Sequence, residues 1–205
     1  MDGDSYFETH LTQHPVMGIF RSYGPEKTVA LCERAWASGV RLVEIPVPNE
    51  AAVPSFLAAQ EAGKAHGAEV GAGTITTVSR LERVHELGAR FTVAPGMNPA
   101  VAEASVRLGV PHLPGVATSS EIGLAVAHGM HWVKAFPAAQ LGSAWITAQR
   151  APFAEVNFVA TGGIDADNAA EFLGAGCRAL AIGSAFGEDV SIDAIAAAVR
   201  GVSER

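Results

Sequence analysis

Lys134 is the residue of this 205-residue sequence whose surroundings most clearly suggest covalent chemistry. It is one of three lysines, and it interrupts residues 132–136, the apolar run WVKAF, which is typical of a buried strand. Burying an ammonium group is costly unless the group is paired or loses its proton, and the neutral amine is a nucleophile for carbonyl carbons. We therefore predict that Lys134 attacks a ketone. The alternative is a structural lysine that pairs with a carboxylate or extends to solvent.

Glu44 interrupts a second apolar run, LVEIPV over residues 42–47. A carboxyl group buried in a strand can give and take protons near neutral pH, as a general acid and base must. The alternative is an ion pair with Lys134 or Arg21. The two interpretations overlap, because a lysine–glutamate pair in an active site can also be catalytic.

Two glycine-containing segments follow predicted strands and are suited to bind a phosphate group. They are Thr161-Gly162-Gly163, which precedes a predicted helix, and Gly183-Ser184. Glycine lets the backbone approach an oxyanion, while backbone N–H groups and hydroxyls donate hydrogen bonds. The alternative is a pair of tight turns in which glycine serves backbone geometry alone.

Arg21 and Thr74 follow two other predicted strands and are candidates to bind a carboxylate. A guanidinium group can hold a carboxylate through two parallel hydrogen bonds. A surface arginine and a turn threonine are the alternatives. The seven histidines form no H-x-x-x-H or H-E-x-x-H pattern, so the sequence predicts no metal site.

Strands and helices that alternate along the chain must position these residues. Eight apolar runs are predicted strands: 16–20, 40–47, 69–73, 91–94, 112–114, 132–136, 156–160 and 179–182. Predicted helices lie between and after them, near 26–38, 50–65, 77–87, 99–108, 119–128, 140–150, 166–174 and 189–200. This pattern predicts a single (β/α)8 TIM barrel over residues 15–205, preceded by an extension or helix over 1–14.

An open doubly wound sheet is the alternative fold. It usually carries a G-x-G-x-x-G turn after its first strand, and that turn is absent here. In a barrel the chemistry lies at the carboxyl ends of the strands. Those ends collect the unusual residues, namely Arg21, Glu44, Thr74, Pro95, Lys134, Thr161-Gly162-Gly163 and Gly183-Ser184.

The composition limits the partners of the protein. The formal net charge is −7, which argues against non-specific binding of nucleic acid. No apolar stretch approaches about 18 residues, so we expect no membrane span, and the polar N-terminus does not resemble a secretory signal. The two isolated cysteines, Cys32 and Cys177, fit a reducing compartment. We expect a cytoplasmic protein that acts on a small molecule.

Five segments, in this order and spacing, resemble the class I aldolases for 2-keto-3-deoxy-6-phosphogluconate and 4-hydroxy-2-oxoglutarate. They are GVRLVEI at 39–45, VGAGT at 70–74, PHLPGV at 111–116, KAFPA at 134–138 and FVATGGI at 158–164. The resemblance implies a homotrimer of barrels that needs no metal or other cofactor. It implies that Lys134 forms the Schiff base and that Glu44 moves protons. It places Arg21, Thr74, Pro95 and Phe136 at the pyruvate end of the substrate, and Thr161, Gly162, Gly163, Gly183 and Ser184 at the phosphate end.

The substrate remains open between two branches of this family. The segment EIPVPN at 44–49 resembles the phosphogalactonate branch, whereas Thr161-Gly162-Gly163 resembles the phosphogluconate branch. Pro48 stands where the phosphogluconate enzymes have an arginine that holds the pyruvate carboxylate, so Arg21 would carry more of that binding. A sugar-phosphate isomerase or epimerase, and a non-catalytic sensor of a phosphorylated sugar acid, are the alternatives outside the family.

Overall fold

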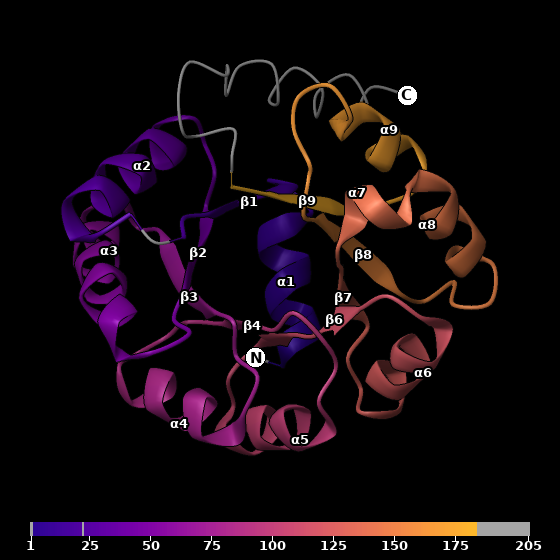
Figure 1. Ribbon diagram of the computed structural model, residues 1–205, viewed down its shortest axis with the longest axis horizontal. Helices are drawn as coiled ribbons and strands as arrows, with labels where there is room; N and C mark the ends of the chain where they lie inside the picture. The colour runs from indigo at the N-terminus through magenta and orange to yellow at the C-terminus, as the bar shows by residue number, and fades with distance from the viewer. Residues whose placement is uncertain (1, 22, 184–205) are drawn as a thin grey trace.

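The computed structural model describes residues 2–21 and 23–183, and it shows a ring of parallel strands surrounded by helices (Figure 1). The predicted helix at 189–200 and Ser184 lie outside the described residues. The described strands are β1 (Val16–Ile19), β2 (Leu42–Pro46), β3 (Glu69–Gly73), β4 (Thr92–Val93), β5 (His112–Leu113), β6 (Gly115–Val116), β7 (Trp132–Ala135), β8 (Asn157–Thr161) and β9 (Ala179–Ile182). The described helices are α1 (Gly3–Leu11), α2 (Pro25–Ala37), α3 (Val53–His66), α4 (Val78–Glu86), α5 (Pro99–Leu108), α6 (Ser119–Ala127), α7 (Ala138–Leu141), α8 (Ser143–Arg150) and α9 (Ala169–Gly174).

The sheet closes through one short run of chain. Its strand order is β5-β4-β3-β2-β1-β9-β8-β7-β6, and every neighbouring pair is parallel. β5 pairs with β4 and β6 pairs with β7, and only Pro114 separates β5 from β6. The carbonyl of Pro114 accepts a hydrogen bond from the Lys134 N–H at 2.8 Å. If β5 and β6 are counted as the two halves of one barrel strand, the described sheet is an eight-stranded parallel barrel. This confirms the predicted fold and excludes the open sheet.

Three predicted elements differ from the structure. The fifth predicted strand, 112–114, ends at Leu113 because Pro114 has no N–H to donate, and an additional strand that was not predicted, β6, follows Pro114 and pairs with β7. The predicted helix at 140–150 is divided into α7 and α8 at Gly142, whose φ of 80° is incompatible with a continuing helix. The predicted helix at 50–65 begins as a separate 3-10 turn, Glu50–Ala52, before α3.

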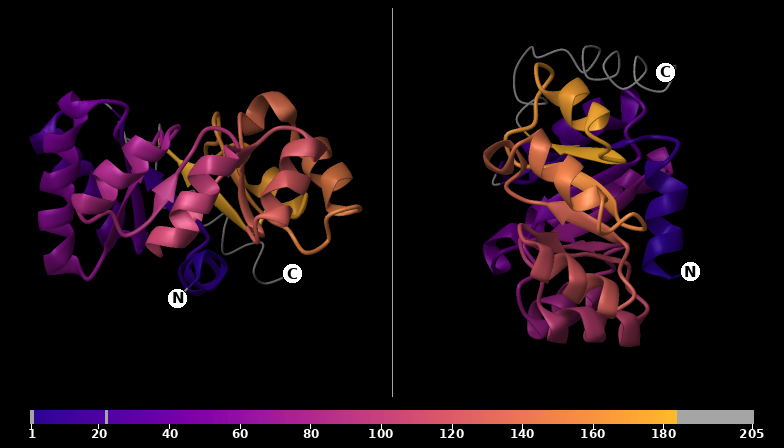
Figure 2. Two further views of the ribbon diagram at one scale, coloured as in Figure 1. Left: turned by 90° about the horizontal axis from the view of Figure 1, so that it is seen from below. Right: turned by 90° about the vertical axis from the view of Figure 1, so that its right-hand side faces the viewer.

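Helix α1 covers the amino ends of the strands (Figures 1 and 2). Its Phe7 and Leu11 are fully buried and pack in one cluster with residues from the barrel interior. The Asp4 carboxylate accepts hydrogen bonds from the backbone N–H groups of His131 and Trp132, at 2.9 and 3.1 Å. These contacts fasten α1 to the beginning of β7. None of the described helices is long and apolar enough to cross a membrane.

The two-residue period of the strands determines which side chains enter the barrel. Leu42 and Trp132, at the beginnings of β2 and β7, belong to the interior cluster, whereas Val43 and Val133 pack toward the outer helices. Because alternate residues point to the same face, the next inward positions along these strands belong to Glu44 and Lys134.

Candidate active site

Lys134 and Glu44 lie together inside the barrel. The Lys134 Nζ atom is 3.7 Å from Glu44 Oε2, and the two side chains are 7% and 1% exposed. The same nitrogen lies 5.2 Å from the centre of the Phe136 ring. The structure therefore brings together the two residues whose burial the sequence made conspicuous, one layer above the packed interior.

The Glu44 carboxylate is poorly satisfied for a buried group. Neither of its oxygens has a hydrogen-bond partner in the described part of the chain, and 3.7 Å from an amine is longer than a hydrogen bond. A buried polar group without a partner costs stability. Such an arrangement indicates a group that is kept available to react with or bind a ligand, rather than an ion pair optimised for stability.

A cavity of about 370 Å³ opens beside this pair at the carboxyl ends of the strands. Seven predicted site residues line it: Arg21, Lys134, Phe136, Thr161, Gly162, Gly163 and Gly183. The sequence did not single out its other lining residues, Ile19, Tyr23, Ile164 and Ala181. The cavity lies where the barrel fold predicts a site, and its wall is formed by strands β1, β7, β8 and β9 together with the segments that follow them.

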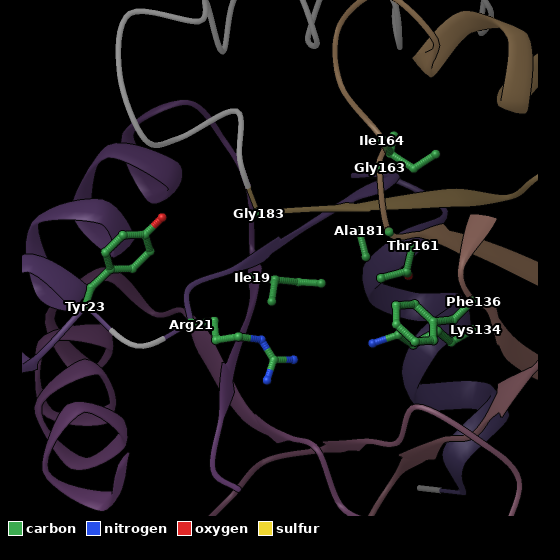
Figure 3. Close-up of a pocket in the computed structure, with 11 residues that line it drawn as sticks. Ile19, Arg21, Tyr23, Lys134, Phe136, Thr161, Gly163, Ile164, Ala181 and Gly183 are labelled. Carbon is green, nitrogen blue, oxygen red and sulfur yellow. The ribbon is translucent and has the colours of Figure 1, made fainter. Parts of the chain in front are cut away.

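Two cationic side chains project into the cavity from opposite walls. Figure 3 shows the guanidinium of Arg21 and the amine of Lys134 directed toward each other across the opening, with Gly163 on the wall beside β8. Arg21 is exposed and free of the packed core, whereas Lys134 is buried. This charge distribution suits a ligand with an anionic group near its reacting carbon.

The loop after β8 is held in place by side-chain hydrogen bonds. Gly162 and Gly163 have φ values of 93° and 71°, which favour glycine. Asn168 Nδ2 donates to the Gly163 carbonyl at 2.7 Å, and Asn168 Oδ1 accepts from the Asp165 N–H at 3.1 Å. Asp165 Oδ1 in turn accepts from the Asn168 N–H at 3.2 Å. Asn168 was not predicted from the sequence, although Asp and Asn three residues apart after a glycine turn are typical of loops fixed by side-chain hydrogen bonds to the backbone.

Three further predicted site residues lie apart from the cavity wall. Glu44 is 3.7 Å from the Lys134 amine but does not line the cavity. Thr74 and Pro95 follow β3 and β4, and neither strand contributes to the cavity wall. Thr74 has a φ of 66°, an uncommon conformation for a β-branched residue and one that is typical of functional sites. Pro95 is exposed. Ser184 lies outside the described residues.

The remaining reactive side chains give no support to a metal or thiol site. The described residues include no group of three or more His, Cys, Asp or Glu side chains that could hold a metal ion. Cys32 and Cys177 are buried, and desolvation raises the pKa of each thiol to about 12. Both cysteines are therefore unreactive thiols within the core.

The closed barrel and its lysine-lined cavity define a TIM-barrel enzyme. A family model described as "Aldolase: KDPG and KHG aldolase" matches residues 7–198. The chain belongs to this family, whose named members are aldolases and hence lyases. Membership favours the aldolase over the isomerase and sensor alternatives.

The relatives of this chain fall in both substrate branches. A 2-dehydro-3-deoxy-phosphogluconate aldolase of Treponema pallidum is 36% identical over 78% of this chain and 76% of its own length. A probable 2-dehydro-3-deoxy-6-phosphogalactonate aldolase of Rhizobium meliloti is 32% identical over 84% and 81%. The KDPG aldolase of Legionella pneumophila, solved with pyruvate captured as a covalent carbinolamine, is 27% identical with a TM-score of 0.77 and covers 92% of this chain and 93% of its own.

Proposed function

We propose that this protein is a class I aldolase that cleaves a 2-keto-3-deoxy-6-phospho sugar acid of the gluconate type to pyruvate and glyceraldehyde 3-phosphate. Cleavage of 4-hydroxy-2-oxoglutarate to pyruvate and glyoxylate would follow the same chemistry. The observation that carries the proposal is the buried Lys134 amine, which lines the cavity 3.7 Å from the Glu44 carboxylate. The covalent carbinolamine reported for the Legionella relative supports a lysine nucleophile in this family.

The reaction begins with attack of the neutral Lys134 amine on the 2-keto carbon. Glu44 delivers a proton to the carbinolamine hydroxyl, water leaves, and an iminium forms. The C3–C4 bond then breaks as the C4 hydroxyl loses its proton to Glu44, directly or through a water. The electron pair of that bond passes into the iminium, which becomes an enamine, and the aldehyde departs. The enamine takes a proton at C3, and hydrolysis releases pyruvate and regenerates the amine.

The other predicted residues bind the two ends of the substrate. Arg21 faces Lys134 across the cavity and holds the carboxylate next to the keto group (Figure 3). Thr74, Pro95 and Phe136 surround the pyruvate portion. The phosphate binds backbone N–H groups and hydroxyls at the end of β8 and in the loops after β8 and β9, namely those of Thr161, Gly162, Gly163, Gly183 and Ser184.

The phosphogalactonate acid is the second candidate substrate, and two observations favour it. Pro48 replaces the arginine expected in the gluconate branch, and the Rhizobium relative is named for the galactonate reaction. Side-by-side assays of the two phosphorylated acids and unphosphorylated 4-hydroxy-2-oxoglutarate separate these possibilities. A higher kcat/KM for the galactonate acid would replace the first assignment with the second.

Reductive trapping tests the Schiff base. Incubation with pyruvate and borohydride is expected to attach one pyruvate-derived group to Lys134, which peptide mass spectrometry locates. Lys134→Arg is expected to abolish both the adduct and turnover, because a guanidinium group remains protonated. Lys27→Arg is the matched control and retains both. An adduct on another residue, or turnover without any adduct, contradicts the mechanism.

We also propose that the enzyme is a cytoplasmic homotrimer, as the family resemblance implies. It would require no cofactor and would act on its acid substrate without nucleic acid or membrane partners. The two buried free cysteines are consistent with a reducing compartment. Light scattering during size-exclusion chromatography measures the oligomeric state, and a mass of about 21 kDa instead of three times that value would exclude the trimer.

A further inference from the structure

Gly73, the last residue of β3, occupies the space immediately beside the Glu44 carboxyl group. A Cβ atom built on Gly73 would lie 1.8 Å from Glu44 Oε1, 2.5 Å from its Cδ and 2.8 Å from its Cγ. All three distances are below 3.0 Å, closer than a Cβ atom approaches a non-bonded heavy atom. An alanine at position 73 therefore cannot coexist with Glu44 in its present position.

The backbone does not require glycine at this position. Gly73 has no left-handed φ, unlike ten other glycines in the described part of the chain, whose φ values are positive. Its carbonyl accepts a regular hydrogen bond from the Val47 N–H at 2.9 Å. Glycine in a strand interior weakens the strand and often marks a close approach by another group. The close approach here is the Glu44 carboxyl.

We propose that Gly73 is a positioning residue for Glu44: its missing side chain keeps the carboxyl inside the barrel beside Lys134. The inference rests on the proposed function, in which Glu44 moves protons at the carbon attached to Lys134. A side chain at position 73 displaces the carboxyl group and leaves the lysine, the cavity wall and the anion-binding loops in place.

Gly71 provides a matched control two residues earlier on the same face of β3. A Cβ on Gly71 would lie 2.6 Å from three atoms of the Phe91 ring, in the packed interior below the site. Gly71 also has no left-handed φ. Both substitutions to alanine thus overpack the barrel interior from one strand, but only the one at position 73 reaches Glu44.

Steady-state kinetics in two backgrounds test the inference. Gly73→Ala is expected to lower kcat by roughly 10²-fold or more, the scale of positioned acid–base catalysis, while KM changes by less than about threefold. In a Glu44→Ala background, Gly73→Ala is expected to cause no further loss of kcat, because the group it displaces is absent. Gly71→Ala is expected to change kcat much less than Gly73→Ala.

Thermal unfolding of the same variants does not depend on catalysis. Gly73→Ala is expected to lower the Tm of the unmodified protein by about 2–8 °C, as overpacking does. In the Glu44→Ala background, the double variant is expected to have a Tm within about 2 °C of that of the Glu44→Ala single variant. Gly71→Ala is expected to lower Tm equally in both backgrounds, because its obstacle is Phe91. If Gly73→Ala does not fold, recovery of folding in the Glu44→Ala/Gly73→Ala variant supports the same conclusion.

Three outcomes would overturn the inference: an unchanged kcat in Gly73→Ala, an equal Tm loss from Gly73→Ala in both backgrounds, or failure of both the single and the double variant to fold. Each would mean that the glycine serves something other than Glu44. If pyruvate cannot be trapped on Lys134 in the unmodified enzyme, the proposed function is rejected instead. The Tm measurements would still test whether position 73 contacts Glu44, because they do not depend on catalysis.

Discussion

Buried polar side chains differ between the amino end of the barrel, where the interior is packed, and the carboxyl end, which opens into a cavity. His112 and Thr92 share a 2.9 Å hydrogen bond within the described interior, and Asp4 accepts the N–H groups that begin β7. At the carboxyl end, Glu44 has no hydrogen-bond partner among the described residues, although the buried Thr161 hydroxyl donates to the Val159 carbonyl at 3.4 Å. The contrast indicates that stability and reactivity depend on different parts of the barrel: the paired groups lie on α1, β4 and β5, and the unpaired carboxylate lies on β2.

Glu44→Gln is expected to have the largest effect and to fall on activity. An amide of similar shape cannot transfer the protons that the mechanism requires, so kcat should fall by about 10²–10⁴-fold, or about 3–5 kcal/mol in the activation barrier. Rapid-quench measurement of pyruvate release checks this change. Retention of kcat within threefold would mean that another group, or water alone, moves the protons.

Phe7→Ala tests the opposite end, where the effect should fall on stability. Phe7 is fully buried in α1 and packs against Phe91 and Trp132. Removing its ring is expected to lower the free energy of unfolding by about 3–5 kcal/mol, while kcat at 25 °C changes less than threefold. Urea unfolding and steady-state assays of the same preparation measure both quantities, with Phe7→Leu as the milder control. A large loss of kcat in the folded variant would show that packing at the amino end affects the candidate site at the carboxyl end.

His112 makes the amino end sensitive to acid. Burial lowers the pKa of this histidine from 6.5 to about 4. Between these values the unfolded chain binds a proton that the folded chain does not, so stability must decrease as the pH falls below about 6.5. The expected loss is about 2 kcal/mol between pH 7 and pH 5.

Urea titrations of His112→Asn against the parent measure this contribution. The variant is expected to lose less stability than the parent over that pH range, although its absolute stability is lower. His85→Asn, at an exposed position, is the control and should keep the parent's pH dependence. Identical slopes for the parent and His112→Asn would assign the acid sensitivity to other groups.

Thr74→Gly should have the smallest effect, with opposite signs for stability and activity. The φ of 66° strains a β-branched residue by about 1–3 kcal/mol, and glycine relieves that strain at a smaller entropic cost of about 0.5–1 kcal/mol. We expect the free energy of unfolding to rise by up to about 1 kcal/mol, and kcat/KM to fall because a substrate contact is lost. A calorimetric scan measures the change in stability, and an initial-rate assay measures the change in kcat/KM. Decreased stability would show that the Thr74 side chain holds the fold instead.

The alternation of apolar strand runs with helical stretches was enough to predict the barrel, and the charged residues that interrupt two of those runs, Glu44 and Lys134, were predicted to be buried. A two-residue period fixes which face a side chain occupies, and the carboxyl ends of parallel strands lie at one end of a barrel. The separation of β5 from β6 at Pro114 was not predictable, because it depends on which neighbours each half of the run meets.

Some features of the site depend on the relative heights of the strands. The closeness of Gly73 to Glu44 arises from the register between β2 and β3, which pairs Pro46 with Gly73. Nothing in either strand alone specifies that register. The path of the loop after β1 likewise decides that Tyr23 lines the cavity, and the paths after β3 and β4 place Thr74 and Pro95 outside its wall.

Helix α1 also determines how the products leave. It covers the amino end of the barrel, and its Phe7 ring packs against the Phe91 ring in the barrel interior. Within residues 2–21 and 23–183, a molecule attached to Lys134 therefore reaches solvent through the cavity at the carboxyl end of the barrel, past the loops that would hold the phosphate. Under the proposed reaction, release is sequential: the aldehyde departs first, and pyruvate can diffuse away only after that passage is vacant.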